Sequence, residues 1–222
     1  MAVNKEVFLS LQQELQPHGA ALIAVSKLKP ASDILELYDL DHRDFGENYV
    51  QELANKYQEL PKDIRWHFIG HLQSNKVKYI APFVYLIHGV DSLKLLQEID
   101  KQGRKSNRII DVLLQVHIAR EETKFGLSEE ELLDVWRSLS AAPLANTCLR
   151  GLMGMASFTE DAGKIQFEFA HLQSLFHRMQ KAELAGSRVD TLSMGMSADY
   201  KLALQAASTT IRIGSMLFGP RG

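Results

Sequence analysis

The feature of this chain that most constrains its fold is a regular alternation of short apolar segments with longer amphipathic segments. Strand-like apolar segments occur eight times, at residues 21–25, 43–46, 65–69, 83–88, 109–117, 148–153, 189–193 and 210–213. Helical patterns fill the intervals at residues 30–40, 49–59, 93–102, 129–139, 162–184 and 198–207, and an additional N-terminal helix is expected at 6–15. Ser32 or Asp33 is expected to cap the first of these intervening helices. This order predicts an α/β fold with parallel strands.

Eight strand–helix units in 222 residues fit the size of a (β/α)8 barrel of the TIM type. The short spacing leaves no room for a second domain, so residues 1–222 are predicted to form a single barrel domain. A doubly wound open sheet is the runner-up. That fold would carry a glycine-rich dinucleotide turn after its first strand, whereas residues 26–30 read SKLKP.

Composition narrows the class of protein. The formal net charge is −2 and the basic residues are scattered, so a nucleic-acid partner is not expected. No apolar run approaches the roughly 20 residues that span a bilayer, so no membrane association is predicted and a cytoplasmic location is expected. The one cysteine, Cys148, cannot form an internal disulfide and is interpreted as a buried, inert thiol.

Polar residues follow the predicted strands, at the end of a barrel where active sites lie. Lys27 follows the first strand, and a lysine in a barrel mouth can become the neutral amine that forms a Schiff base. The seventh and eighth strands lead into Ser193 to Ser197 and into Gly214 and Ser215, which are glycine- and hydroxyl-bearing turns where a barrel binds phosphate. Together these residues suggest pyridoxal phosphate held as a Schiff base.

Two further residues have two interpretations each. Arg212 lies two residues before Gly214 in an apolar strand, so it is expected to point into the lumen, either toward a ligand or in an ion pair with a carboxylate such as Asp199. Asn48 follows the second strand and could bond a ligand oxygen or hold its own turn. The histidines at 67 and 71 lack a third ligand, so no metal site is predicted.

Six ordered motifs distributed over essentially the whole chain carry a resemblance to a known family. They are AVSK at 24–27, FGENYVQE at 45–52, WHFIGHLQSNK at 66–76, RGLMGM at 150–155, LSMGMS at 192–197 and IRIG at 211–214. The chain resembles the pyridoxal-phosphate homeostasis protein family, also called YggS or PROSC proteins.

The resemblance implies a barrel similar to the N-terminal domain of alanine racemase, of the fold-type III pyridoxal-phosphate class, with pyridoxal 5'-phosphate linked to Lys27. By motif, the phosphate would be held by Ser197, Gly214 and Ser215, with Ser193 also a candidate cofactor-binding residue. Arg212 would face the pyridine nitrogen, and Asn48 would lie near the ring. The sequence departs from the family at Ser215, often threonine, and at Ala207, often glycine.

The resemblance and these residues together favour a non-catalytic carrier. A cation facing the ring nitrogen weakens the cofactor as an electron sink, and the second β-domain that completes the resembled racemases is not expected here. We therefore expect a protein that buffers pyridoxal phosphate and delivers it to apo-enzymes, acts as a monomer and has no catalytic residues. The alternatives are a small pyridoxal-phosphate-dependent racemase or lyase, and a phosphosugar-binding barrel without a covalent cofactor.

Overall fold

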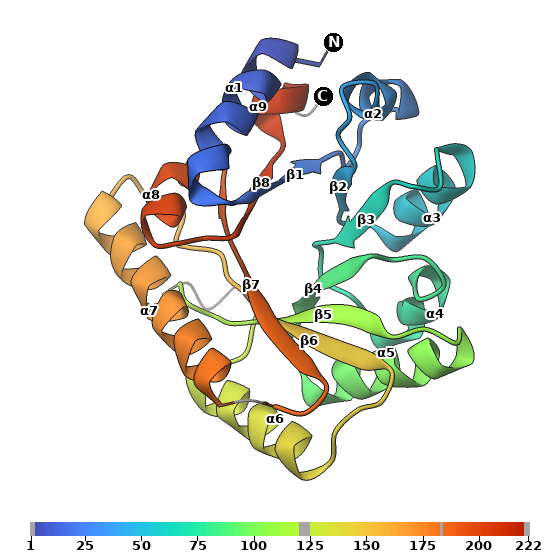
Figure 1. The fold of residues 1–222 in the computed structure, drawn as a ribbon, viewed down its shortest axis with the longest axis vertical. Helices are drawn as coiled ribbons and strands as arrows, with labels where there is room; N and C mark the ends of the chain where they lie inside the picture. Colours follow the sequence, from blue (N-terminus) through green and yellow to red (C-terminus); the bar gives the residue numbers. More distant parts are fainter. Residues whose placement is uncertain (1–2, 120–124, 183, 220–222) are drawn as a thin grey trace.

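Eight parallel strands form a closed barrel, with the strands in chain order around the ring (Figure 1). The computed structural model describes residues 3–119, 125–182 and 184–219. The strands are β1 (Ala21–Val25), β2 (Asp44–Glu47), β3 (Arg65–Phe68), β4 (Leu86–Val90), β5 (Ile110–Gln115), β6 (Thr147–Met153), β7 (Ser187–Met196) and β8 (Thr210–Ile213). The barrel closes where β1 pairs with β8. The predicted TIM-type barrel is confirmed.

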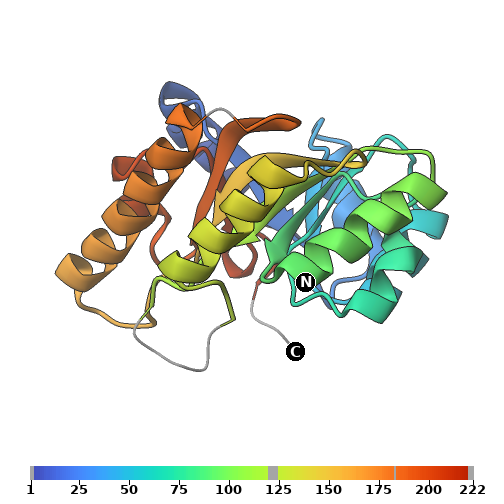
Figure 2. The same cartoon turned by 90° about the horizontal axis from the view of Figure 1, so that it is seen from below.

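The helices form a layer outside the strands, which is clearest for the long helices in Figures 1 and 2. They are α1 (Lys5–Leu15), α2 (Ala31–Tyr38), α3 (Val50–Glu59), α4 (Val77–Ile80), α5 (Leu93–Lys105), α6 (Glu129–Ala141), α7 (Ala162–Lys181), α8 (Tyr200–Gln205) and α9 (Ser215–Phe218), with short 3-10 turns at Gln16–His18 and Ser74–Lys76. Four of them begin at a capping side chain, namely Asn4, Ser92, Ser128 or Asp161. The expected N-terminal helix is present as α1, which is tied to α9 by the Asn4 N–H and the Leu217 carbonyl at 2.8 Å.

The main hydrophobic core lies between the strands and this helical layer. Its largest fully buried side chains include Trp66, Phe45, Phe68 and Phe169. Burying aromatic and branched side chains between two layers is the dominant favourable contribution to folding. Among the described residues, no helix is both long enough and apolar enough to cross a membrane.

Several predicted boundaries and one predicted helix cap were wrong. The fourth strand begins at Leu86 rather than at residue 83, because the Phe83 and Val84 N–H groups donate to the Ile80 carbonyl and form a turn. The seventh strand extends to Met196, so the helix expected at 198 begins at Tyr200. Helix α2 has Pro30 at its N-cap and no side-chain cap, so neither Ser32 nor Asp33 has the expected capping role.

Helix α8 ends in a turn that places a left-handed residue at Ala207. The Ser208 N–H donates to the Ala203 carbonyl at 2.9 Å, and the Ala207 N–H donates to the Leu204 carbonyl at 3.0 Å. These two bonds define a Schellman motif, whose left-handed position usually holds glycine. Ala207 has a φ of +56° and is exposed. The departure from glycine at this position therefore costs conformational energy.

We predict that Ala207→Gly raises the free energy of unfolding by about 0.5–1 kcal/mol, because relief of the left-handed strain exceeds the added entropy of the unfolded chain. Asn107 occupies the corresponding position after α5, with a φ of +52°. Asparagine tolerates this conformation better, so Asn107→Gly is the control and should gain less. Denaturant unfolding of the two variants checks this, and an equal change in both would contradict it.

A second structural feature is the buried histidine His42, which packs edge-on between the rings of Phe8 and Phe45 at centroid distances of 5.3 and 5.1 Å. Its Nε2 is 2.8 Å from the Asp44 carbonyl. Burial lowers the pKa of His42 from 6.5 to about 4, although Asp44 opposes the shift. The folded protein therefore keeps this ring neutral at a pH where the unfolded chain charges it.

We expect the free energy of unfolding to fall as the pH is lowered from 6.5 to about 4, with His42 contributing up to roughly 3 kcal/mol over that range. His42→Gln should remove this part of the pH dependence, since glutamine does not titrate. The exposed His18 provides the control variant His18→Gln. Denaturant unfolding at a series of pH values is the measurement, and an unchanged slope in His42→Gln would rule out this origin.

Candidate functional site

The candidate site lies at the carboxyl edge of four neighbouring strands, β7, β8, β1 and β2. Val25 at the end of β1 pairs with Gly46, so Lys27 and Asn48 follow adjacent strands at similar height. Gly214 follows β8, on the other side of β1. A Cβ built on Gly214 would lie 3.3 Å from the Val25 carbonyl oxygen, so the two loops are in close contact. The structure thus brings together the predicted lysine and the predicted turn after β8.

A buried ammonium group supports the loop that presents Lys27. Lys56 of α3 donates through Nζ to the Ser26 carbonyl at 2.8 Å, and also to carboxylate oxygens of Glu47 at 2.8 Å and Glu52 at 2.7 Å. The same Glu52 oxygen accepts the Leu28 N–H at 2.6 Å. The peptide groups on both sides of Lys27 are therefore tied to one cluster. Sequence reasoning missed Lys56, because its only signal is a lysine at i+4 from Glu52 in a helix.

One carboxylate of this cluster is partly unsatisfied, because Oε2 of Glu47 has no hydrogen-bond partner among the described residues. Glu47 is fully buried, and its Oε1 also accepts the Ser26 hydroxyl at 2.6 Å. Burial raises the pKa of Glu47 above its usual value, against the opposing effect of Lys56.

Leu28 has a φ of +61° and is 61% exposed. A non-glycine residue in this region is strained, and such strain concentrates at functional sites.

Asn48 is half-buried, and its Oδ1 has no hydrogen-bond partner among the described residues. Its backbone is approached closely by the loop after β3, because a Cβ on Gly70 would lie 2.3 Å from the Asn48 carbonyl oxygen. Only glycine at 70 permits that approach. The backbone of Asn48 is therefore packed against this loop while its side-chain oxygen is still available as an acceptor, as expected for contact with a ligand.

The two turns that are predicted to bind phosphate, after β7 and after β8, differ in structure. Gly214 is the N-cap of α9, and Ser215 is its exposed first residue, close to the predicted arrangement. Ser197 follows β7 but lies three residues before α8, not at its start. The Met196 N–H is bonded to the Asp199 carboxylate at 2.6 Å. Of the two turns, the one after β8 more closely resembles the predicted phosphate site.

Arg212 points into the lumen from β8, as predicted, and is 4% exposed. Its Nη1 donates to the Ser193 carbonyl at 2.9 Å and to the Ser193 hydroxyl at 2.6 Å, and its Nη2 donates to the Gly154 carbonyl at 3.2 Å. These partners are neutral oxygens, and the charge of Asp199 also acts on the guanidinium. Burial lowers the pKa of Arg212 to about 10, so it remains a cation near neutral pH.

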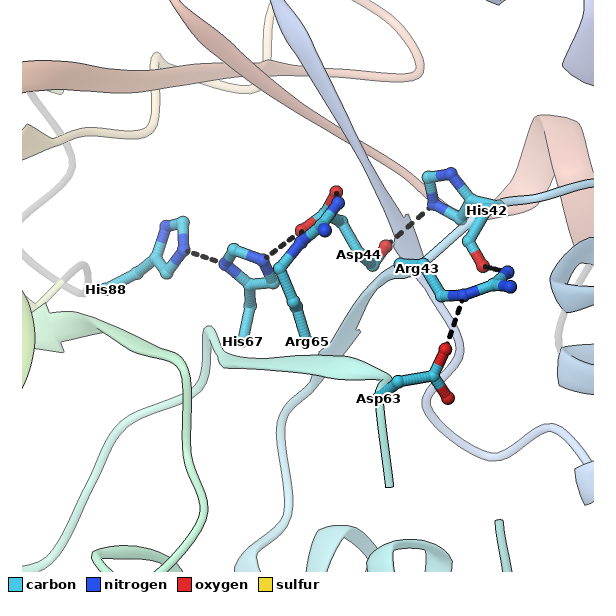
Figure 3. Close-up of polar contacts among 7 residues, drawn as sticks. All are labelled: His42, Arg43, Asp44, Asp63, Arg65, His67 and His88. Carbon is cyan, nitrogen blue, oxygen red and sulfur yellow. Dashed lines mark hydrogen bonds and ion pairs between the residues drawn. The ribbon is translucent and has the colours of Figure 1, made fainter. Parts of the chain in front are cut away.

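Ser193 lies behind the arginine. It is fully buried, and its hydroxyl contacts both Arg212 and the Nδ1 atom of His88 at 3.0 Å. Its assignment as a direct cofactor-binding residue therefore stays a prediction, and its observed contact is with Arg212. Figure 3 shows that His88 in turn contacts His67, which contacts Asp44. Sequence reasoning did not anticipate this set of contacts.

No group of three or more histidine, cysteine, aspartate or glutamate side chains that could hold a metal is present in the described ranges. His71 is paired instead with Asp91 at 3.2 Å. Half-buried Cys148 lies on β6, where burial raises the pKa of its thiol and disfavours the reactive thiolate.

Comparison with known proteins identifies relatives that share this barrel fold. The family model for the N-terminal domain of alanine racemase matches residues 7–222. The pyridoxal phosphate homeostasis protein of Pasteurella multocida is 37% identical over 223 residues, covering 99% of this chain and 94% of that protein. PipY of Synechococcus elongatus, solved without and with PLP bound, is 37% identical, with TM-scores of 0.90 and 0.87 and coverage of 96% of this chain and 99% of PipY. The chain belongs to the pyridoxal phosphate homeostasis protein family, built on the N-terminal barrel of alanine racemase.

Proposed function

We propose that this protein binds pyridoxal 5'-phosphate as a Schiff base on Lys27, buffers it and delivers it to apo-enzymes. The observation that carries the proposal is the closure of β1 on β8, which sets the Lys27 loop against the Gly214 turn. An amine that can condense with an aldehyde then lies beside backbone groups that can receive a phosphate. The relatives named above support the same assignment.

The residues present fit this cofactor. Asn48 offers a buried acceptor without a partner. Arg212 is a buried cation whose hydrogen-bond acceptors among the described residues are neutral oxygens of Ser193 and Gly154. Gly214 gives close access to the backbone, and exposed Ser215 adds a hydroxyl, with Ser197 as a further candidate. We assign phosphate binding to these last three residues and the ring nitrogen to Arg212.

Bound pyridoxal phosphate would supply a reactive aldehyde and an electron-withdrawing ring. Arg212 opposes protonation of the ring nitrogen, because a second positive charge beside the guanidinium is unfavourable. A ring without that proton stabilises carbanions poorly. The arginine therefore suits holding the cofactor better than using it for chemistry on amino acids.

The rim of the site favours exchange of the cofactor with the surroundings. Leu28 beside the lysine is 61% exposed and Tyr49 beside Asn48 is 54% exposed. Water and amines can reach a site with such a rim, whereas efficient catalysis generally needs water excluded and groups held on both faces of the substrate. A site with a solvent-exposed rim therefore suits a carrier better than an enzyme.

A second candidate is a racemase or lyase acting on amino acids, because alanine racemase shares this barrel. We further propose that residues 1–222 form a single barrel domain, that the protein acts as a monomer, and that it works in the cytoplasm, where its recipients would be apo-enzymes that use pyridoxal phosphate. These points extend the carrier proposal and fail with it.

The lysine assignment has a direct spectroscopic test. Protein mixed with pyridoxal phosphate should show a visible absorbance band that borohydride converts into a covalent, irreversible adduct, because a Schiff base is reducible to an amine. Lys27→Ala should lack both. Lys29→Ala is the matched control, since Lys29 lies two residues away with its Nζ bonded to the Phe218 carbonyl at 2.7 Å, and it should keep the band. A colourless wild type would instead favour the phosphosugar-binding alternative.

Carrier and enzyme differ in turnover. We expect cofactor-loaded protein to activate an added apo-enzyme while leaving single amino acids unchanged over many equivalents, because Arg212 opposes the ring protonation on which carbanion stabilisation depends. Lys27→Ala, premixed with the same cofactor and passed through a desalting column, is the control and should activate nothing. Repeated racemisation or cleavage of any amino acid by the wild type would contradict the carrier role.

A further inference from the structure

A continuous line of hydrogen bonds crosses the lumen of the barrel. It joins five side chains in the order Arg212, Ser193, His88, His67 and Asp44, with distances of 2.6, 3.0, 3.1 and 3.0 Å. These residues come from β8, β7, β4, β3 and β2, so the line connects strands on different sides of the ring. Figure 3 shows the part from His88 to Asp44. The line begins at the arginine of the candidate site and ends at the amino edge of the barrel, where Asp44 is the first residue of β2.

The direction of the line is set at its Asp44 end. Arg65 donates to Asp44 through Nε at 2.7 Å, and its charge and hydrogen bonds hold the pKa of that carboxyl well below its usual range. An ionised carboxylate only accepts hydrogen bonds. The Nε2 atom of His67 must therefore carry the proton that faces Asp44.

The Arg212 end imposes the same direction. A guanidinium only donates, so the Ser193 hydroxyl oxygen must accept from Arg212 and its own proton is free to point toward His88. His88 is fully buried, and burial lowers its pKa well below the usual value, so the ring is neutral. A neutral ring that accepts at Nδ1 donates from Nε2, which is the atom that faces Nδ1 of His67.

With a single ring proton on His67, one arrangement of protons satisfies every group of the line. Each of Ser193, His88 and His67 accepts one bond and donates one, and all donation runs from Arg212 toward Asp44. Hydrogen bonds aligned in this way polarise and strengthen one another. The arrangement also presents a fixed lone pair of Ser193 to the Nη1 atom of Arg212.

We propose that Ser193, His88 and His67 are positioning residues for Arg212, fixing its orientation toward the cofactor ring through this one-directional line of bonds. The effect of this positioning on cofactor binding rests on the proposed function, because the orientation of Arg212 affects binding only if the cofactor ring lies against it. The line lets a carboxylate at the far edge of the barrel support the arginine without touching it. Among the described residues, the hydrogen bonds of Arg212 go to neutral oxygens, and these bonds hold the arginine in place.

The proton positions can be tested without any cofactor. Long-range nitrogen–proton NMR of the histidine rings distinguishes the two neutral tautomers. We expect Nε2 of both His67 and His88 to carry a proton and Nδ1 of both to accept a hydrogen bond, with signals assigned through His67→Gln and His88→Gln. A proton on Nδ1 of His88, or a charged His67, would reverse the direction of the line and overturn the proposal.

The consequence for the cofactor is tested with serine variants. Ser193→Ala should weaken pyridoxal phosphate binding about tenfold and shift the position of the visible band, because the arginine loses a bond worth roughly that factor. Ser193→Thr keeps the hydroxyl and should restore both. Ser208→Ala is the matched control: Ser208 is 2% exposed and donates to the Met194 carbonyl at 2.8 Å, not toward Arg212, so both readouts should stay at wild-type values.

The outcomes separate the two proposals. Wild-type affinity and spectrum in Ser193→Ala would overturn the positioning role while the cofactor assignment stands. Absence of any band in the wild type would refute the proposed function, and the NMR tautomers would still decide whether the line exists. If Ser193→Ala does not fold, Ser193→Thr serves in its place. A wild-type visible spectrum together with the wild-type His88 tautomer in Ser193→Thr supports the positioning role of Ser193. A shifted visible spectrum with the wild-type His88 tautomer contradicts that role.

Discussion

The pairing of β1 with β8 is the interaction on which the rest of the structure depends. Residues at opposite ends of the chain, such as Ala21 and Thr210, become partners in this pairing. Bringing such distant segments together costs loop-closure entropy, and the core between barrel and helices offsets it. Without this closure, the Lys27 loop and the Gly214 turn would have no reason to meet, and the candidate site would not exist.

The site combines local strain with support from behind. Leu28 adopts a left-handed conformation, and the Lys56 cluster holds the peptides on both sides of Lys27. Across the lumen, the buried Ser193 hydroxyl bonds both Arg212 and His88. In both places a buried side chain supports a residue that is expected to contact the ligand. Such support is what keeps a binding geometry fixed in a site that remains open to solvent.

Much of the fold and part of the site could be predicted from the sequence. The eightfold alternation identified the barrel, and the rule that chemistry follows strand ends identified Lys27, Asn48 and Gly214. The extension of β7 was missed because Gly195, with a φ of +95°, lies in a bulge between β7 and β8 that reads as a turn. Lys56 and His88 were missed for another reason, since a single polar residue inside a helix or strand has no spacing signal. Their roles depend on partners that only the folded barrel brings within reach.

The central claim is that this closure assembles one cofactor site from the ends of β1, β2 and β8. A crystal structure of the protein after incubation with pyridoxal phosphate tests it most directly. The account predicts continuous density from the Lys27 side chain to the ligand, the phosphate on the amides of Gly214 and Ser215, and the ring nitrogen against Arg212. Density on another lysine, or a ring turned away from Arg212, would contradict it.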